Sequence, residues 1–449
     1  MLRRDLLKTL GAAAFVNVAF SESSPAQSAA NAQANPLNYQ QEPIPALQVP
    51  ETPAGSATDL AKDEQYWESI RKMFILDAKA IPMANGFGGF TPQAILDEVA
   101  RLASDAAHMK ALLYLGRQES GPSAPLSRLM AQDFGADPEE VTLNRNASEG
   151  LATVLFGLDL RRGDEVLLNT QEYGGSFDIL RQREAREGIK TRTIKLPLPS
   201  ISAEDIVTRL EGAITPMTRA LVICHIFSNS GEIMPIADIC RMAHRHGVFV
   251  LVDGAHGPGQ IPFNLHALGC DAYVASLHKW FMAPRGTGMI YIRKDRIPDI
   301  WPHTYWERDV PRGSIEKFES YGTVDLSVPA SLPMVFEFNR ALTYAKKEAR
   351  LRYLRQRWVS QLSSVPRVRI LTNQSPAFTC AMSAFQVEGA DPEKLWLLLL
   401  RKYHVRTRAF VEDEDPQVAG LTVGASLINS LADCDRLVDA VSKATQSDV

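Results

Sequence analysis

Between residues 141 and about 293, the sequence alternates short apolar, β-branched runs with segments of helical periodicity. This alternation is typical of a mostly parallel sheet with helices on both faces, the α/β class. Ligands of such sheets gather outside the carboxyl ends of the strands, so functional residues are expected there. The runs that predict strands are EVLLN, TRTIKL, RALVICHIF, GVFVLVDG, DAYVAS and GMIYIR.

The length of 449 residues favours two domains, because one hydrophobic core stops growing well before that size. We predict a signal peptide over 1–32 and a linker over 33–57. An N-terminal segment with a large domain is expected over 58–325, and a smaller α+β domain over 326–449. DLAKDEQYWESIRKMFIL and VFEFNRALTYAKKEARLRYLRQRWVSQL each predict one helix, and NGFGG predicts a loop without a Walker or dinucleotide pattern.

The N-terminus combines Arg3 and Arg4 with an apolar stretch over 9–20, followed by small residues that suit cleavage. The stretch is too short to span a bilayer, so an export signal is favoured over an uncleaved anchor. The paired arginines resemble a Tat signal, which directs the export of folded proteins. We therefore expect a periplasmic protein that engages the Tat translocase and has no membrane span in its mature form.

Composition points to a small-molecule site. A net charge of −4 provides no basic excess to attract nucleic acid or anionic lipid. The five cysteines are odd in number and lack zinc-like spacing, which favours structural thiols and predicts no metal centre.

A lysine and a carboxylate stand at the ends of two predicted strands. Lys279, in SLHKW, follows the strand DAYVA. A lysine amine forms a Schiff base only when it is deprotonated, which requires burial or cationic neighbours, whereas a lysine by itself is usually a solvated charge. Asp253 ends the strand VFVLVD, where a buried carboxylate needs a partner such as a pyridinium nitrogen; the alternative is a cap on the next turn. His256 could lie beside such a ring.

An anion site is predicted at the start of the helix in RNASEGLATVLFGL. Ala147 and Ser148 occupy its first turn, where free N–H groups and the helix dipole favour a phosphate. Ser276 and His278 would supply donors from the other side. Alternatively, Ser148 and Glu149 merely cap the helix.

Across roughly residues 81–325, the chain resembles class V aminotransferase-like enzymes of fold type I, which use pyridoxal 5′-phosphate (PLP), and especially their isopenicillin N epimerase-like branch. The order and spacing of the matching motifs are more specific for this family than any single motif. The matching segments are RNASEGL, LDLRRGDEVLLNTQEYGG, HIFSNSGEIMPI, VDGAHGPGQ, SLHKW, RGTGMIYI and GTVD.

The resemblance implies a role for each matching residue. Lys279 would form the Schiff base and carry protons, Asp253 would pair with the pyridine nitrogen, and His256 would contact the ring oxygen. Tyr173 would stack on the ring, and Ser228, which replaces an Asn common in the family, would face it. The phosphate contacts would be Ala147, Ser148, Ser276, His278 and, from the neighbouring subunit of a homodimer, Thr323.

One departure from the family concerns the substrate carboxylate. The arginine that normally binds it is replaced by Thr422 in LTVGASLIN. A hydroxyl cannot replace a bidentate guanidinium. Either Arg406 or Arg408, in HVRTRAF, takes over this role, or the substrate is not a free α-amino acid.

The leading interpretation is transamination or epimerisation of an amino acid or a compound derived from one. β-Elimination is a second possibility, but desulfuration needs a mobile cysteine, and Cys380 lies in the apolar run AFTCAMSAF, which predicts a core position. An exported enzyme could also tailor a secreted peptide natural product, as the similar pyoverdine-maturation enzymes do. A binding protein that has lost catalysis is the remote alternative.

Overall fold

The computed structural model describes residues 46–107, 124–320, 322, 324–412 and 415–446. The predicted signal peptide, most of the predicted linker and Thr323 lie outside these residues. None of the helices in these ranges is both long and apolar enough to cross a bilayer.

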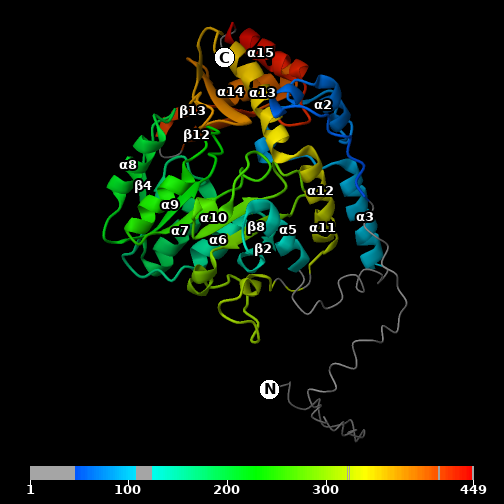
Figure 1. The fold of residues 1–449 in the computed structure, drawn as a ribbon. Helices are drawn as coiled ribbons and strands as arrows, with labels where there is room; N and C mark the ends of the chain where they lie inside the picture. The colour runs from blue at the N-terminus through cyan, green and yellow to red at the C-terminus, as the bar shows by residue number, and fades with distance from the viewer. Residues whose placement is uncertain (1–45, 108–123, 321, 323, 413–414, 447–449) are drawn as a thin grey trace, which may run out of the picture. The chain divides into compact units, whose positions relative to one another are not determined.

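A seven-stranded sheet forms the centre of the fold (Figure 1), in the order β2-β8-β7-β6-β5-β3-β4. All neighbouring strands from β4 to β7 pair in parallel, whereas β8 is antiparallel to both β7 and β2. The mostly parallel sheet is therefore confirmed, and six of its strands match the predicted runs. The strands are β2 (Val141–Asn144), β3 (Glu165–Asn169), β4 (Lys190–Ile194), β5 (Thr218–Cys224), β6 (Phe249–Asp253), β7 (Ala272–Ser276) and β8 (Gly288–Ile292).

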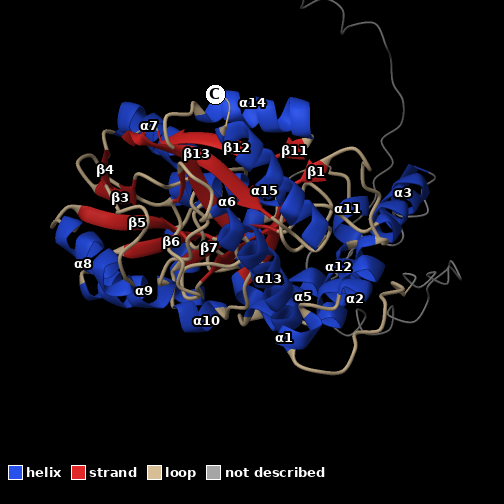
Figure 2. Cartoon of the chain, turned by 90° about the horizontal axis from the view of Figure 1, so that it is seen from above, coloured by secondary structure: helices blue, strands red, loops and turns tan. Residues whose placement is uncertain are grey.

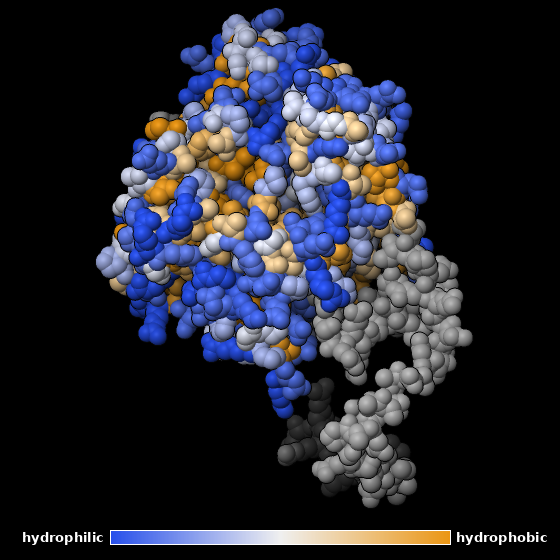
Figure 3. Space-filling view, in the orientation of Figure 1, coloured by the Kyte–Doolittle hydropathy of each residue, from blue (hydrophilic) through white to orange (hydrophobic). Residues whose placement is uncertain are grey.

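Helices cover both faces of this sheet, which explains why every residue of β6 and β7 is buried. Seen from above, α8, α9 and α10 line one face and α6 and α7 the other (Figure 2). Outside this layered core, one face of the molecule is mostly hydrophilic, with apolar residues in small groups (Figure 3). The helices are α6 (Ala147–Gly157), α7 (Gly174–Glu187), α8 (Ala203–Ala213), α9 (Ile236–Arg245) and α10 (Leu265–Leu268).

The C-terminal part holds a four-stranded antiparallel sheet in the order β12-β13-β10-β9. A segment from the N-terminal part of the chain also belongs to this region, because β1 (Ile81–Pro82) pairs in parallel with β11 (Val405–Arg406) in a separate two-stranded sheet. Ile81 packs into the same apolar core as Trp358 and Leu421. The strands are β9 (Val368–Ile370), β10 (Met382–Val387), β12 (Arg408–Glu412) and β13 (Asp415–Gly424), and the helices α14 (Pro392–Tyr403) and α15 (Leu431–Thr445).

Two predicted helices are each divided in the structure. The first becomes α1 (Ala57–Leu60) and α2 (Glu64–Arg71), because the Asp63 carboxylate accepts a hydrogen bond from the backbone N–H of Tyr66 and starts a new helix. The second becomes α12 (Leu332–Leu342) and α13 (Tyr344–Leu362), because Thr343 adopts a φ of 58°, which a helix cannot continue.

The remaining elements connect these layers. Among them, η2 is a single turn within the segment predicted as a loop. They are α3 (Gln93–Ala107), α5 (Ala124–Phe134), α11 (Ser327–Ala330), η2 (Asn85–Phe87), η3 (Pro138–Glu140), η4 (Lys294–Asp299) and η5 (Ile315–Phe318).

Candidate active site

A cavity of about 460 Å³ lies at the carboxyl ends of β5, β6 and β7. It is lined by every described residue that the sequence assigned to cofactor binding. Four further lining residues were not predicted, since nothing in their local sequence marks them. The predicted residues are Ala147, Ser148, Tyr173, Ser228, Asp253, His256, Ser276, His278 and Lys279, and the additional ones are Phe87, Asn146, Cys224 and Ala255.

The ammonium of Lys279 loses its proton more readily than that of an exposed lysine. Burial lowers the pKa of its ammonium to about 8, an effect that the negative charge of Asp253 partly offsets. Its Nζ lies 3.1 Å from Nε2 of His256. A deprotonated amine is the nucleophilic form, so Lys279 meets the first requirement for Schiff-base chemistry.

The tautomer of His256 follows from its second neighbour. The indole N–H of Trp280 donates to His256 Nδ1 over 3.2 Å, and an indole nitrogen can only donate. Burial holds the pKa of His256 well below its usual range, so the ring is neutral and carries its proton on Nε2. That N–H faces Lys279 Nζ, where it stabilises a neutral amine and opposes an ammonium.

Asp253 is a buried carboxylate, and a cation bound in the cavity would stabilise its charge. It is 3% exposed, and one of its oxygens accepts the backbone N–H of Ala255 over 2.9 Å. Burial raises its pKa, while the positive charge of Lys279 opposes this rise. A cationic ring nitrogen in the cavity would offset the cost of burying this charge.

The N-terminus of α6 also lines the cavity. Asn146 caps the helix by accepting the backbone N–H of Glu149, and Ser276 Oγ accepts that of Ala147 over 3.0 Å. The Ser276 hydroxyl proton is therefore directed away from this backbone bond. Ser148 also lines the cavity at this helix start, where the dipole favours an anion.

His278 completes this anion site in a proton-dependent way. Its Nδ1 lies 3.1 Å from the carbonyl oxygen of Thr287, which can only accept, so Nδ1 carries a proton. Burial lowers the pKa of His278, which favours the neutral ring with a bare Nε2. His278 can thus donate to an anion from Nε2 only after it gains a second proton.

Two glycines allow close approaches around the cavity. A Cβ at Gly175 would lie 2.4 Å from the Tyr173 ring, so glycine permits that ring to stand over the start of α7, where 42% of it remains exposed. A Cβ at Gly89 would lie 2.1 Å from the carbonyl oxygen of Lys279. The glycine-rich segment, predicted only as a loop, therefore packs against the backbone of the lysine.

The structure distinguishes the two candidate arginines. Arg408 lines the cavity with Lys279, whereas Arg406 lines a neighbouring one. Arg408 on β12 pairs directly with Thr422 on β13, and Thr422 Oγ1 is engaged with the carbonyl oxygen of Asn229 over 2.7 Å. Directly paired residues project from the same face of a sheet, so a guanidinium is available one strand away from the usual arginine position.

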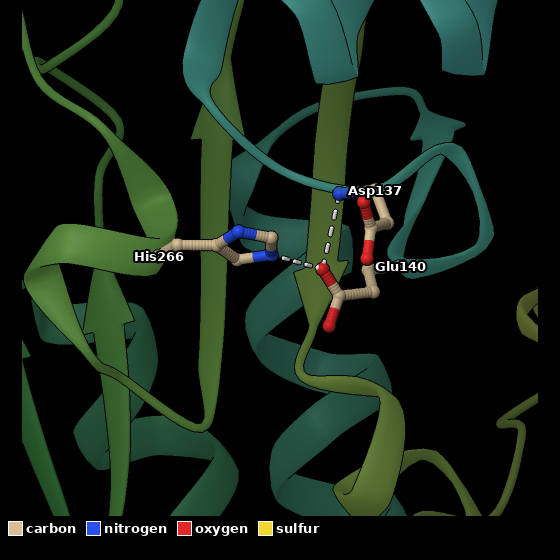
Figure 4. A group of neighbouring side chains, drawn as sticks. All are labelled: Asp137, Glu140 and His266. Carbon is tan, nitrogen blue, oxygen red and sulfur yellow. Dashed lines mark hydrogen bonds and ion pairs between the residues drawn. The ribbon is translucent and has the colours of Figure 1, made fainter.

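Two other groups bear on function: the cysteines, of which only Cys224 lines this cavity, and a cluster of two carboxylates and a histidine outside it. All five cysteines are buried, and Cys380 donates its thiol to the Gln260 carbonyl oxygen while burial raises its pKa to about 12. Asp137, Glu140 and His266 lie close together (Figure 4). Glu140 already accepts hydrogen bonds from His266 and from backbone N–H groups, which tie η3 to α10. We interpret both groups as structural.

The cavity combines four features that bind PLP. A buried amine can react with its aldehyde, and a buried carboxylate can pair with its ring nitrogen. An aromatic side chain can stack on its ring, and a helix N-terminus can bind its phosphate. The fold and this residue set define a fold type I PLP enzyme. The aminotransferase class-V family model matches residues 126–410, and the chain belongs to that family. Its cofactor is therefore pyridoxal 5′-phosphate.

Similar proteins agree with this assignment. Isopenicillin N epimerase of Streptomyces clavuligerus is 29% identical over 405 residues, covering 84% of this chain and 98% of the relative. A C-DES mutant with glycine covalently linked to PLP has a TM-score of 0.71 at 24% identity, covering 83% of this chain and 98% of its own. A cysteine desulfurase of Escherichia coli has a TM-score of 0.72 at 21% identity, covering 85% and 98%.

Proposed function

We propose that this enzyme moves a proton at the α-carbon of an amino acid, or of a compound derived from one, and thereby catalyses epimerisation or transamination. The observation that carries the proposal is the buried Lys279 amine, whose pKa burial lowers to about 8 and whose Nζ lies 3.1 Å from Nε2 of His256. The epimerase relative, which aligns along most of both chains, supports the same interpretation.

When bound, PLP attaches to an amine and withdraws electrons from the α-carbon. Asp253 would keep the ring nitrogen protonated, and the anion site at α6 would fix the phosphate. Displaced by the substrate amine, Lys279 would be a free base beside the α-carbon. The atom that receives the proton back from Lys279 would decide between epimerisation and transamination.

Arg408 would bind the substrate carboxylate. Its guanidinium lines the cavity beside the Phe87 ring, and no described residue forms an ion pair with it. A guanidinium matches a carboxylate with two parallel hydrogen bonds. Arg408 would thereby take over from the threonine at position 422, and the substrate would be a free α-amino acid after all.

β-Elimination remains the second candidate within the same chemistry, since the early steps are shared. Desulfuration through a cysteine persulfide is disfavoured, because Cys380 is fully buried and hydrogen-bonded with a raised pKa.

Exchange at the α-carbon tests this proposal. PLP-loaded protein is incubated with a panel of amino acids in deuterated water, and deuterium incorporation, enantiomer ratio, keto acids and released sulfide or ammonia are measured. We expect deuterium at the α-carbon of at least one amino acid, with loss of chirality or formation of a keto acid, and no exchange by Lys279→Ala. Exchange with none of them would contradict the proposal.

We also propose Tat-dependent export and a homodimer in which Thr323 reaches the partner's phosphate site. Both rest on sequence resemblance. Replacing Arg3 and Arg4 by lysine should retain the protein in the cytoplasm, and undiminished export would refute the first proposal. A monomer in analytical ultracentrifugation of the loaded protein would refute the second. Acting on a secreted peptide natural product would be compatible with export.

A further inference from the structure

A second cavity, of about 280 Å³, adjoins the candidate active site and shares Phe87 and Arg408 with it. The Arg408 guanidinium carbon lies 3.9 Å from the centre of the Phe87 ring, so this pair forms the partition between the two cavities. The other walls of the second cavity include Glu393, Trp396, Leu400, Arg406, Thr407 and Ala409.

The second cavity offers an apolar wall. Trp396 and Leu400 stand one turn apart on α14, and both are partly buried. An apolar part of a ligand could pack against these two side chains.

Arg406 is the group of this cavity that could hold an anion. Among the described residues, none forms an ion pair or a side-chain hydrogen bond with its guanidinium, although Glu393 lines the same cavity. Arg408, in the partition, is assigned to the α-carboxylate and is not counted here. A planar guanidinium with free donors is the group best suited to a terminal carboxylate or phosphate.

We propose that this second cavity is a side-chain subsite, which selects amino substrates that carry a bulky apolar side chain ending in an anion. The inference rests on the proposed function, in which the α-amino group lies at Lys279 and the α-carboxylate at Arg408. The side chain then extends past Phe87, packs its apolar part on Trp396 and Leu400, and pairs its terminal anion with Arg406.

Three amino acids test the subsite: alanine, phenylalanine and 4-carboxyphenylalanine. The measurement is the concentration of each that half-saturates the change in visible absorption of the PLP-loaded protein. We expect this concentration to fall in the order given, with 4-carboxyphenylalanine binding about tenfold more tightly than phenylalanine, as one charge-assisted pair would provide.

Variants of the second cavity separate its parts. Trp396→Ala should weaken both aromatic amino acids relative to alanine. Arg406→Gln should remove only the difference between the two aromatic ones, and Glu393→Gln should widen it. Arg401→Gln, an exposed position on α14 outside the cavity, is the matched control and should change no ratio. Ala409→Phe, which fills the cavity, should weaken both aromatic amino acids.

Equal half-saturating concentrations for the three amino acids in the wild type, or ratios that no cavity variant changes, would overturn the subsite. The same holds if none of the three perturbs the absorption of a protein that carries its Lys279-linked band. The proposed function stands or falls separately: a protein that exchanges the α-proton of any amino acid retains it, whatever the three ratios show.

Discussion

Replacing Trp280 by phenylalanine should raise the pKa of Lys279. The indole N–H fixes the His256 proton on Nε2. Without that donor, the imidazole can adopt the other tautomer, in which a bare Nε2 accepts a hydrogen bond from the Lys279 ammonium. The charged amine is thereby stabilised by up to one hydrogen bond, about 0.5–1.5 kcal/mol, which corresponds to a rise of about 0.4–1.1 in the pKa.

The assay is the pH dependence of the rate at which cofactor-free protein combines with PLP, followed by the growth of visible absorption. Its midpoint should lie near pH 8 in the wild type, the value to which burial lowers the pKa of Lys279, and higher in Trp280→Phe. Nitrogen NMR of labelled histidine should find the His256 proton on Nε2 in the wild type. Trp301→Phe is the control, because Trp301 is 49% exposed and lies outside the cavity.

Trp280 is 1% exposed, so Trp280→Phe should also lower stability through lost packing. Thermal unfolding records that loss independently, and packing by itself would not move the midpoint. An unchanged midpoint in Trp280→Phe, or a wild-type spectrum with the His256 proton on Nδ1, would refute the reasoning.

Three further predictions concern charge. Arg408→Gln should raise the half-saturating concentration of an amino acid substrate about ten- to a hundredfold, because a charge-assisted pair is lost; an unchanged value would exclude Arg408 from carboxylate binding. Burial raises the pKa of Glu172 from 4.5 to about 8, so the folded chain keeps a proton that the unfolded chain releases, and stability should fall as the pH rises through this interval. Glu172→Gln should therefore gain about 1–3 kcal/mol over the wild type in urea unfolding at alkaline pH, and an exposed Glu388→Gln should not. Below neutral pH, where Lys279 remains an ammonium, PLP affinity measured by equilibrium dialysis should fall with rising pH as His278 loses its second proton. Binding in that range that is independent of pH, and that His278→Gln leaves unchanged, would argue against this role.

Much of the site could be predicted from the sequence, because it sits where the strands of a parallel sheet end. Asp253 ends a continuous apolar run, and Lys279 follows another, so their place at one edge of the sheet follows from topology. The start of α6 was also predicted, through Ala147 and Ser148, but the residue that caps it is Asn146 and not Ser148.

What the sequence could not provide are contacts between distant segments. Phe87 lines the cavity, and Gly89 packs against the backbone of Lys279, only because the N-terminal segment folds against the loop that carries this lysine. Arg406 and Arg408 are two residues apart, so the sequence places both on the same face of an extended strand and cannot distinguish them. Only the pairing of β12 with β13 places Arg408 beside Thr422. The helix break at Thr343 depends on a positive φ, which is rare for a β-branched residue and therefore could not be predicted from the sequence.

The most direct test of the central claim compares purified wild type with Lys279→Ala by visible absorption, before and after PLP is added. The claim that Lys279 binds PLP covalently predicts an absorption band in the wild type that changes with amino acid substrates and is absent or shifted in Lys279→Ala. Circular dichroism of both proteins would verify that the variant is folded. A wild type that remains colourless after PLP is added, or a variant with an unchanged band, would contradict the claim.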